Sequence, residues 1–63
     1  MPVIHVYGYP RSVEKRRALV RGITKATCKA YEVAPEIVIV YIHDVAKDHA
    51  GHAGALASDD NKG

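Results

Sequence analysis

The sequence predicts an α+β fold in which one βαβ unit with a parallel strand pair is followed by a short carboxyl-terminal hairpin. Three observations predict it: an alternating β-branched and aromatic segment near the start, one long amphipathic segment, and a second β-branched run. With 63 residues the chain forms a single domain, 1–63. A domain of this size buries only about 60% of its unfolded surface, so we also expect an oligomer.

The first strand is expected over residues 3–7, where β-branched and aromatic residues alternate. Gly8 and Pro10 then mark a tight loop. Ser12 is suited to cap a following helix with its hydroxyl group, and Glu14 would put negative charge in the first turn, where the helix dipole favours it.

A helix of about five turns is expected from residue 13 to about residue 31, because no proline interrupts this segment. An apolar stripe should face the strands; it consists of Leu19, Val20, Ile23, Ala26, Ala30 and Tyr31. A basic stripe should face solvent; it consists of Arg17, Arg21, Lys25 and Lys29, together with Lys15 and Arg16. Cys28 has no neighbouring His or second Cys, which indicates a packing residue.

The second strand is expected over residues 37–42, an uninterrupted run typical of a strand covered on both faces. Residues 47–54 resemble a loop, residues 55–58 a short hairpin or edge strand, and residues 59–63 a polar tail that should fray. Two strands and one helix leave one sheet face bare, which again calls for a partner subunit.

Composition excludes several classes of protein. Nine Lys and Arg against seven Asp and Glu give a formal charge of +2, and no aromatic residues interleave with the basic stripe, so a solvated helix face is favoured over nucleic-acid binding. No apolar run reaches the ~20 residues that span a bilayer, and the amino-terminal segment lacks the pattern of a secretory signal. A single cysteine fits a reducing compartment, so we expect a cytoplasmic protein.

Four short motifs follow one another in a defined order. They are Met1-Pro2-Val3-Ile4, Arg11-Ser12, Ala34-Pro35 and Gly51-x-x-Gly54-x-Leu56-Ala57-Ser58. In this order and spacing the chain resembles, over residues 2–58, the small-subunit 4-oxalocrotonate tautomerases of the tautomerase superfamily. The resemblance implies a cofactor-free isomerase that moves a proton on a small enolisable or unsaturated 2-oxo acid. It also implies a hexamer built as a trimer of dimers, from identical or from different subunits.

The resemblance assigns the catalytic base to Pro2, as the amino-terminal residue after removal of Met1. An α-amino group titrates near pH 7.7–8.0, and both desolvation and nearby cations would favour its neutral form, which can accept a proton from carbon. The simpler interpretation is that Pro2 only begins an edge strand, where no N–H is needed. If Met1 stays attached, the Pro2 nitrogen lies in a peptide bond and cannot act as a base.

The resemblance implies that Arg11 binds the carboxylate of the substrate. A guanidinium group is suited to this role because it can hold a carboxylate through two parallel hydrogen bonds. A solvated loop arginine is the alternative.

Several departures from the family pattern argue against the dianionic substrate after which the family is named. Ile39 or Val40 stands where the second arginine would be, and Ala50 where an aromatic residue lines the pocket. The first loop is one residue shorter, with Pro10 before the arginine, and the tail carries Asp59-Asp60 in place of basic residues.

Histidines and carboxylates gather within ten positions after the second strand; they are His43, Asp44, Asp48, His49 and His52. Their spacing matches no known zinc motif, so we expect no metal site. The histidines are expected at the surface, or one of them, His49, enters the pocket in place of the missing arginine. His5 on the first strand should be partly buried, with its hydrogen bonds satisfied.

The missing second arginine and pocket aromatic also leave room for a different class of function. The chain would then be a catalytically silent structural subunit, or a binder of small ligands, with the same fold. The intact mass of the chain distinguishes the silent subunit from the enzyme, because retention of Met1 favours the silent subunit and loss of Met1 favours the enzyme.

Overall fold

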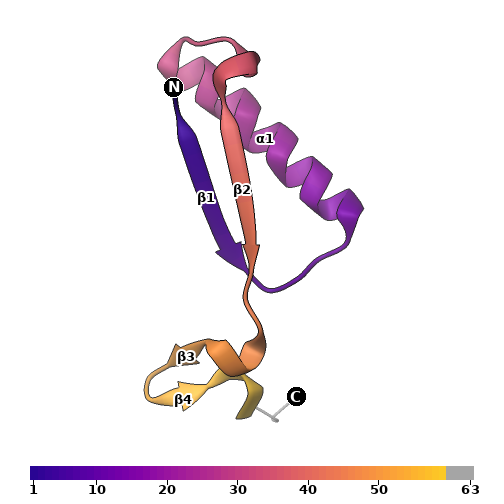
Figure 1. Cartoon of the computed structure of the whole chain (residues 1–63), viewed down its shortest axis with the longest axis vertical. Helices are drawn as coiled ribbons and strands as arrows, with labels where there is room; N and C mark the ends of the chain where they lie inside the picture. Colours follow the sequence, from indigo (N-terminus) through magenta and orange to yellow (C-terminus); the bar gives the residue numbers. More distant parts are fainter. Residues whose placement is uncertain (60–63) are drawn as a thin grey trace.

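A computed structural model describes residues 1–59 of the chain. Its main body consists of β1 (Val3–Gly8), α1 (Val13–Tyr31) and β2 (Ile39–Asp44). The two strands lie side by side and α1 crosses behind them, covering one face of the pair (Figure 1). The predicted βαβ unit, and the predicted span of its helix, are confirmed.

The strands are parallel and in continuous register, from Val3 opposite Ile39 to Gly8 opposite Asp44. Because side chains alternate along a strand, the pair has two distinct faces. The face toward α1 carries four half-buried aliphatic residues, namely Ile4, Val6, Val40 and Ile42. The opposite face, called the open face below, carries Val3, His5, Tyr7, Ile39, Tyr41 and His43. The prediction that the second strand is covered on both faces is therefore wrong for the single subunit.

The second strand starts two residues later than predicted. Pro35–Ile37 forms a turn of 3₁₀-helix, in which the Ile37 N–H donates to the Ala34 carbonyl at 3.3 Å and the Val38 N–H to the Pro35 carbonyl at 3.1 Å. A proline is well suited to the first position of such a turn, because its fixed φ matches and it lacks an N–H. Ile37 is thereby withdrawn from the sheet, although its side chain suits a strand.

The helix begins and ends as its sequence suggests. The Ser12 hydroxyl accepts a hydrogen bond from the Lys15 N–H at 3.2 Å, and Glu14 occupies the first turn. At the other end Glu32 adopts a left-handed conformation, with φ of 57°, and the chain turns towards β2.

The face of α1 that meets the strands differs from the predicted apolar stripe. Val20 and Ile23 are half-buried as expected, whereas four members of the stripe are exposed in the subunit: Leu19, Ala26, Ala30 and Tyr31. Their places on the inner face are taken by Arg16, Thr24, Thr27 and Cys28. These positions follow one another at helical spacing, and the aliphatic parts of Arg and Thr side chains pack against apolar neighbours. The prediction that Arg16 lies on the solvated stripe is wrong, because its side chain is half-buried.

The segment after β2, called the carboxyl-terminal arm below, extends beyond the end of the strands (Figure 1). It contains a 3₁₀ turn (Lys47–His49), β3 (Gly51–His52), β4 (Ala55–Leu56) and a second 3₁₀ turn (Ala57–Asp59). The two short strands pair antiparallel around Ala53 and Gly54, whose φ values of 54° and 83° are those of a type I′ turn. The predicted hairpin is confirmed, but its bounds differ: β3 lies within the predicted loop 47–54, and Ala57 and Ser58 belong to a 3₁₀ turn. The predicted frayed tail falls largely on residues 60–63, outside the described residues.

The subunit has no closed core of its own. No residue among 1–59 is fully buried, and the molecule is elongated, measuring 43 × 24 × 14 Å. Its accessible surface is 5197 Å², whereas a compact monomer of this mass exposes about 4000 Å². The excess is larger than the ~800 Å² that each partner contributes to a standard protein interface.

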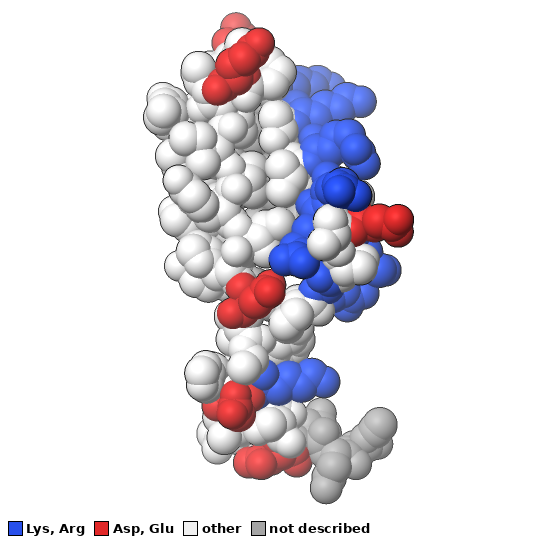
Figure 2. All heavy atoms as spheres, turned by 45° about the vertical axis from the view of Figure 1, so that its right-hand side comes forward, with Lys and Arg blue, Asp and Glu red and all other residues white. Residues whose placement is uncertain are grey.

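Figure 2 shows two contrasting surfaces of the body. Lys and Arg side chains gather over α1, while a broad area without charged side chains lies over the strands. Among residues 1–59, no helix is both long enough and apolar enough to span a lipid bilayer.

Candidate active site

Pro2 lies at the amino end of the strand pair. Its carbonyl accepts a hydrogen bond from the Ile39 N–H at 3.1 Å, which ties the residue to the start of β2. Pro2 is half-buried in a shallow hollow, whose other lining residues are Met1, Val3, Ile4, Thr27, Tyr31 and Val33. None of these side chains is charged, so a basic nitrogen here would be partly desolvated and its neutral form favoured.

Met1 precedes Pro2, and the Pro2 nitrogen is therefore part of a peptide bond in the chain as described. The Met1 residue is 80% exposed. It is thus accessible for removal, and its loss leaves the hydrogen bond that holds Pro2 unchanged, because that bond uses the Pro2 carbonyl.

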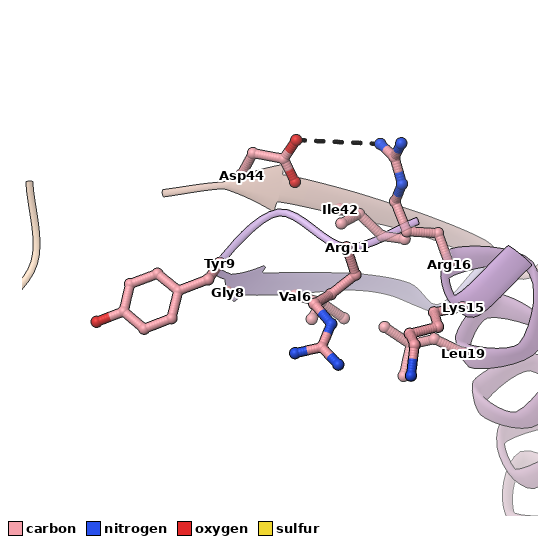
Figure 3. Close-up of a pocket in the computed structure, with 9 residues that line it drawn as sticks. All are labelled: Val6, Gly8, Tyr9, Arg11, Lys15, Arg16, Leu19, Ile42 and Asp44. Atoms are coloured by element: carbon pink, nitrogen blue, oxygen red, sulfur yellow. Dashed lines mark ion pairs between the residues drawn. The ribbon is translucent and has the colours of Figure 1, made fainter. Parts of the chain in front are cut away.

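Arg11 lies at the other end of β1, in the loop that leads to α1. It lines a second hollow of about 280 Å³, together with Val6, Gly8, Tyr9, Lys15, Arg16, Leu19, Ile42 and Asp44 (Figure 3). Aliphatic side chains from β1, β2 and α1 make up the apolar part of its wall, and three cations stand around it: Arg11, Lys15 and Arg16. An apolar cavity with a few convergent charged groups is the usual form of a small-molecule site.

The three cations differ in their surroundings. Arg16 is turned toward Asp44, and its Nη1 atom lies 4.0 Å from a carboxylate oxygen (Figure 3). Its Nε is buried and has no hydrogen-bond partner. Within residues 1–59, neither Arg11 nor Lys15 has a carboxylate within 4.0 Å. The local excess of positive charge is therefore carried by Arg11 and Lys15.

The Pro2 hollow and the Arg11 hollow share no residue and lie at opposite ends of β1. The six residues of β1 alone span about 20 Å, at ~3.3 Å per residue. A small substrate cannot reach both ends of one subunit. If Pro2 and Arg11 act on the same molecule, they come from different subunits.

His49 lies in the carboxyl-terminal arm and lines neither hollow. Its side chain is 75% exposed, and its Nε2 atom lies 3.8 Å from an Asp48 carboxylate oxygen. The subunit thus does not bring His49 together with Pro2 or Arg11. Ala50, at the position of the expected aromatic residue, lines a shallow depression with Tyr7, Tyr9 and two further residues, Gly8 and Val45.

The remaining histidines are dispersed. His43 points to the open face, where its Nε2 atom lies 2.8 Å from the Nδ1 atom of His5. His5 is therefore hydrogen-bonded as predicted, but it is exposed in the subunit and not partly buried. Among residues 1–59, no three metal-ligating side chains converge.

Three side chains with polar groups at the Arg11 hollow were not singled out from the sequence as site residues, namely Tyr9, Lys15 and Arg16. Lys15 and Arg16 were counted with the solvated basic stripe. Because Arg11 precedes α1, which begins at Val13, helical spacing offered no signal that Lys15 would lie beside it.

Comparison with known proteins identifies the family. A family model described as Tautomerase enzyme matches residues 2–60. The chain belongs to the tautomerase family. The similar proteins described below support its assignment to the 4-oxalocrotonate tautomerase branch of that family, in agreement with the resemblance.

Similar members of the tautomerase family cover nearly the whole chain. A probable tautomerase of Halalkalibacterium halodurans is 38% identical over 60 residues, which are 94% of this chain and 98% of that protein. The 2-hydroxymuconate tautomerase of Comamonas testosteroni is 35% identical over 94% of this chain and 95% of its own length. The crystal structure of YwhB, a homologue of 4-oxalocrotonate tautomerase, aligns with a TM-score of 0.88 and 32% identity, covering 92% of this chain and 97% of YwhB. Family membership supports tautomerase activity, a form of isomerisation, as the general function of the chain.

Proposed function

We propose that the chain, after removal of Met1, is a tautomerase whose amino-terminal Pro2 nitrogen is both general base and general acid. The main observation behind this proposal is that Pro2 is half-buried in a hollow whose lining side chains are uncharged, an environment that favours a neutral amine at neutral pH. Membership of the tautomerase family adds to it.

In the proposed reaction, the Pro2 nitrogen accepts a proton from a carbon next to the carbonyl of a small 2-oxo acid, or from its enol hydroxyl. The electron pair of the broken bond moves into the conjugated system, and the ring nitrogen becomes an ammonium group. That group returns the proton at another atom of the same system. Reactant and product have the same atoms, so the step needs no cofactor. Arg11 holds the substrate carboxylate.

We further propose that Pro2 and Arg11 of different subunits form each site, because they lie at opposite ends of β1. Two subunits related by a two-fold axis, with their β1 strands antiparallel, would bring the amino end of one strand to the carboxyl end of the other. A hexamer, as a trimer of such dimers, would also cover the open face. One solved relative is a heterohexameric 4-oxalocrotonate tautomerase from Chloroflexus aurantiacus J-10-fl. At 24% identity this relative supports the shared fold only. Our proposal of a homo-oligomer is supported instead by the bare sheet face and the large exposed surface of the chain.

The role of Pro2 is tested with a chain whose amino terminus carries a cleavable extension. Activity on a phenylenolpyruvate-type enol should appear only when a protease exposes Pro2, and intact mass should confirm the new terminus. The Pro2→Ala variant, cleaved in the same way, should lose about 10²-fold or more in kcat/KM. Equal, slow turnover by the cleaved wild-type and Pro2→Ala chains, or full activity before cleavage, would refute the proposal.

The shared site is tested by mixing subunits. Pro2→Ala and Arg11→Ala chains should each be nearly inactive, but a mixed dimer retains one site with both residues intact. After co-refolding at equal amounts, about one quarter of the wild-type activity should return, since half of the dimers are mixed. If native mass spectrometry shows mixed oligomers and activity stays absent, Pro2 and Arg11 do not share a site between subunits.

A catalytically silent subunit, or a small-ligand binder, is the second candidate. One observation favours it: neither Ile39 nor Val40, at the position of the family's second arginine, offers a second cation. The intact mass of the natively produced chain decides between the candidates. A mass that includes Met1 supports the silent subunit, and a mass lower by one methionine supports the enzyme.

A further inference from the structure

We infer that Lys15 supplies, beside Arg11, the second positive charge of the carboxylate site, and that the substrate carries its negative charge at one end only. The inference rests on the proposed function and concerns the substrate class of the same site.

The first step is the arrangement of charges around the Arg11 hollow. Figure 3 draws the charged ends of Arg11 and Lys15 on one side of the hollow, and Arg16 turned the other way, toward Asp44. The Arg16–Asp44 pair is close to neutral as a unit. Arg11 and Lys15 remain, without a carboxylate within 4.0 Å in the described part of the chain.

The second step is the position of this charge relative to α1. Lys15 lies in the first turn, where its backbone N–H is fixed by the Ser12 hydroxyl at 3.2 Å. Cations at a helix amino terminus oppose the helix dipole, and Glu14 is the acidic residue of that turn. A bound carboxylate would interact favourably with the dipole and with both side chains, so the local electrostatics favour an anion here.

The third step is the contrast with the Pro2 hollow. Its lining side chains are apolar or carry hydroxyl groups, and none is charged. A substrate with a carboxylate at each end would place one of them against this uncharged lining, which disfavours a charge. A monocarboxylate with an apolar remainder fits both hollows. The site is therefore suited to enols of aryl- or alkyl-substituted 2-oxo acids rather than to dicarboxylates.

The experiment compares Lys15→Gln with Lys25→Gln, which makes the same chemical change at an exposed α1 position that lines neither hollow. Both chains are prepared with Pro2 as the terminus. With phenylenolpyruvate, Lys15→Gln should raise KM about tenfold with little change in kcat, because a charge-assisted contact to a non-reacting carboxylate is lost. Lys15→Arg should restore most of the affinity, and Lys25→Gln should match the wild type.

A second arm compares substrates. The wild type should have a kcat/KM for phenylenolpyruvate at least about tenfold above that for the dicarboxylate 2-hydroxymuconate. An unchanged KM in Lys15→Gln, or a preference for the dicarboxylate, overturns the inference. Either result leaves the proposed function intact as long as Pro2→Ala is inactive. If Pro2→Ala keeps full activity, the proposed function itself is wrong.

Discussion

The two faces of the strand pair are built from the same two strands but differ in what they carry. The face under α1 is aliphatic along Ile4, Val6, Val40 and Ile42 and ends in an ion pair between α1 and β2. The open face has two aliphatic residues, Val3 and Ile39, at its amino end and four aromatic rings beyond them, and it carries none of the charged residue types Lys, Arg, Asp and Glu.

The rings of the open face form a continuous stack. The ring centroids of Tyr7 and His43 are 4.4 Å apart, those of His43 and His5 are 5.0 Å apart, and those of His5 and Tyr41 are 5.3 Å apart. The face under α1 is thus covered within one chain, whereas the open face is an ordered aliphatic and aromatic surface that nothing in the described chain covers. This difference is what we expect if the open face packs against a second subunit.

The largest effect should come from a charge in the middle of the open face. Tyr41→Glu is expected to abolish assembly, because burial of an unpaired carboxylate costs several kcal/mol. If Pro2 and Arg11 act across subunits, activity should disappear as well. The measurement is the molar mass by light scattering on a sizing column. Lys25→Glu, a larger change of charge on the outer side of α1, should leave the assembly intact; its dissociation as well would show that the open face is not special.

The covered face should respond through stability and not through assembly. Ile42→Ala removes a half-buried side chain under α1 and is expected to lower the unfolding free energy by about 2 kcal/mol. Ile37→Ala, the same truncation at an exposed position, should cost less than half of that. Urea denaturation of both variants at one protein concentration makes the comparison. Equal losses would mean that the two positions are packed alike in the assembled protein.

The elements of the fold and the parallel pairing of β1 and β2 could be predicted from the sequence, but the start of β2 and the side of α1 that faces the strands could not. Local signals sufficed for β1, α1 and the hairpin: alternation, the Ser12 cap, the absence of proline, and small residues around Gly54. The start of β2 was misplaced because Ile37 has a strand-forming side chain, while Pro35 directs the backbone into a turn.

The candidate site was harder to predict, because it depends on contacts between distant residues. His5 and His43 meet because the strand register brings them together, although 38 residues separate them. Arg16 was counted as solvated since its partner Asp44 is remote in sequence. Pro2 and Arg11 were assigned through a resemblance. The predicted strand over residues 3–7 already separates them along the chain, but only the structure shows that they line two hollows with no residue in common.

The smallest effect on stability should come from the ion pair that ends the covered face. The Arg16 and Asp44 side chains are 40% and 46% exposed, so Asp44→Asn should change the unfolding free energy by no more than about 0.5 kcal/mol. The same substitution releases the charge of Arg16 next to Arg11 and Lys15. Carboxylate binding at the hollow should tighten a few-fold, and the gain should shrink as salt is added. Calorimetric titration with phenylacetate at two salt concentrations measures this, and weaker binding in Asp44→Asn would show that Asp44 orients Arg16 for the ligand instead of neutralising it.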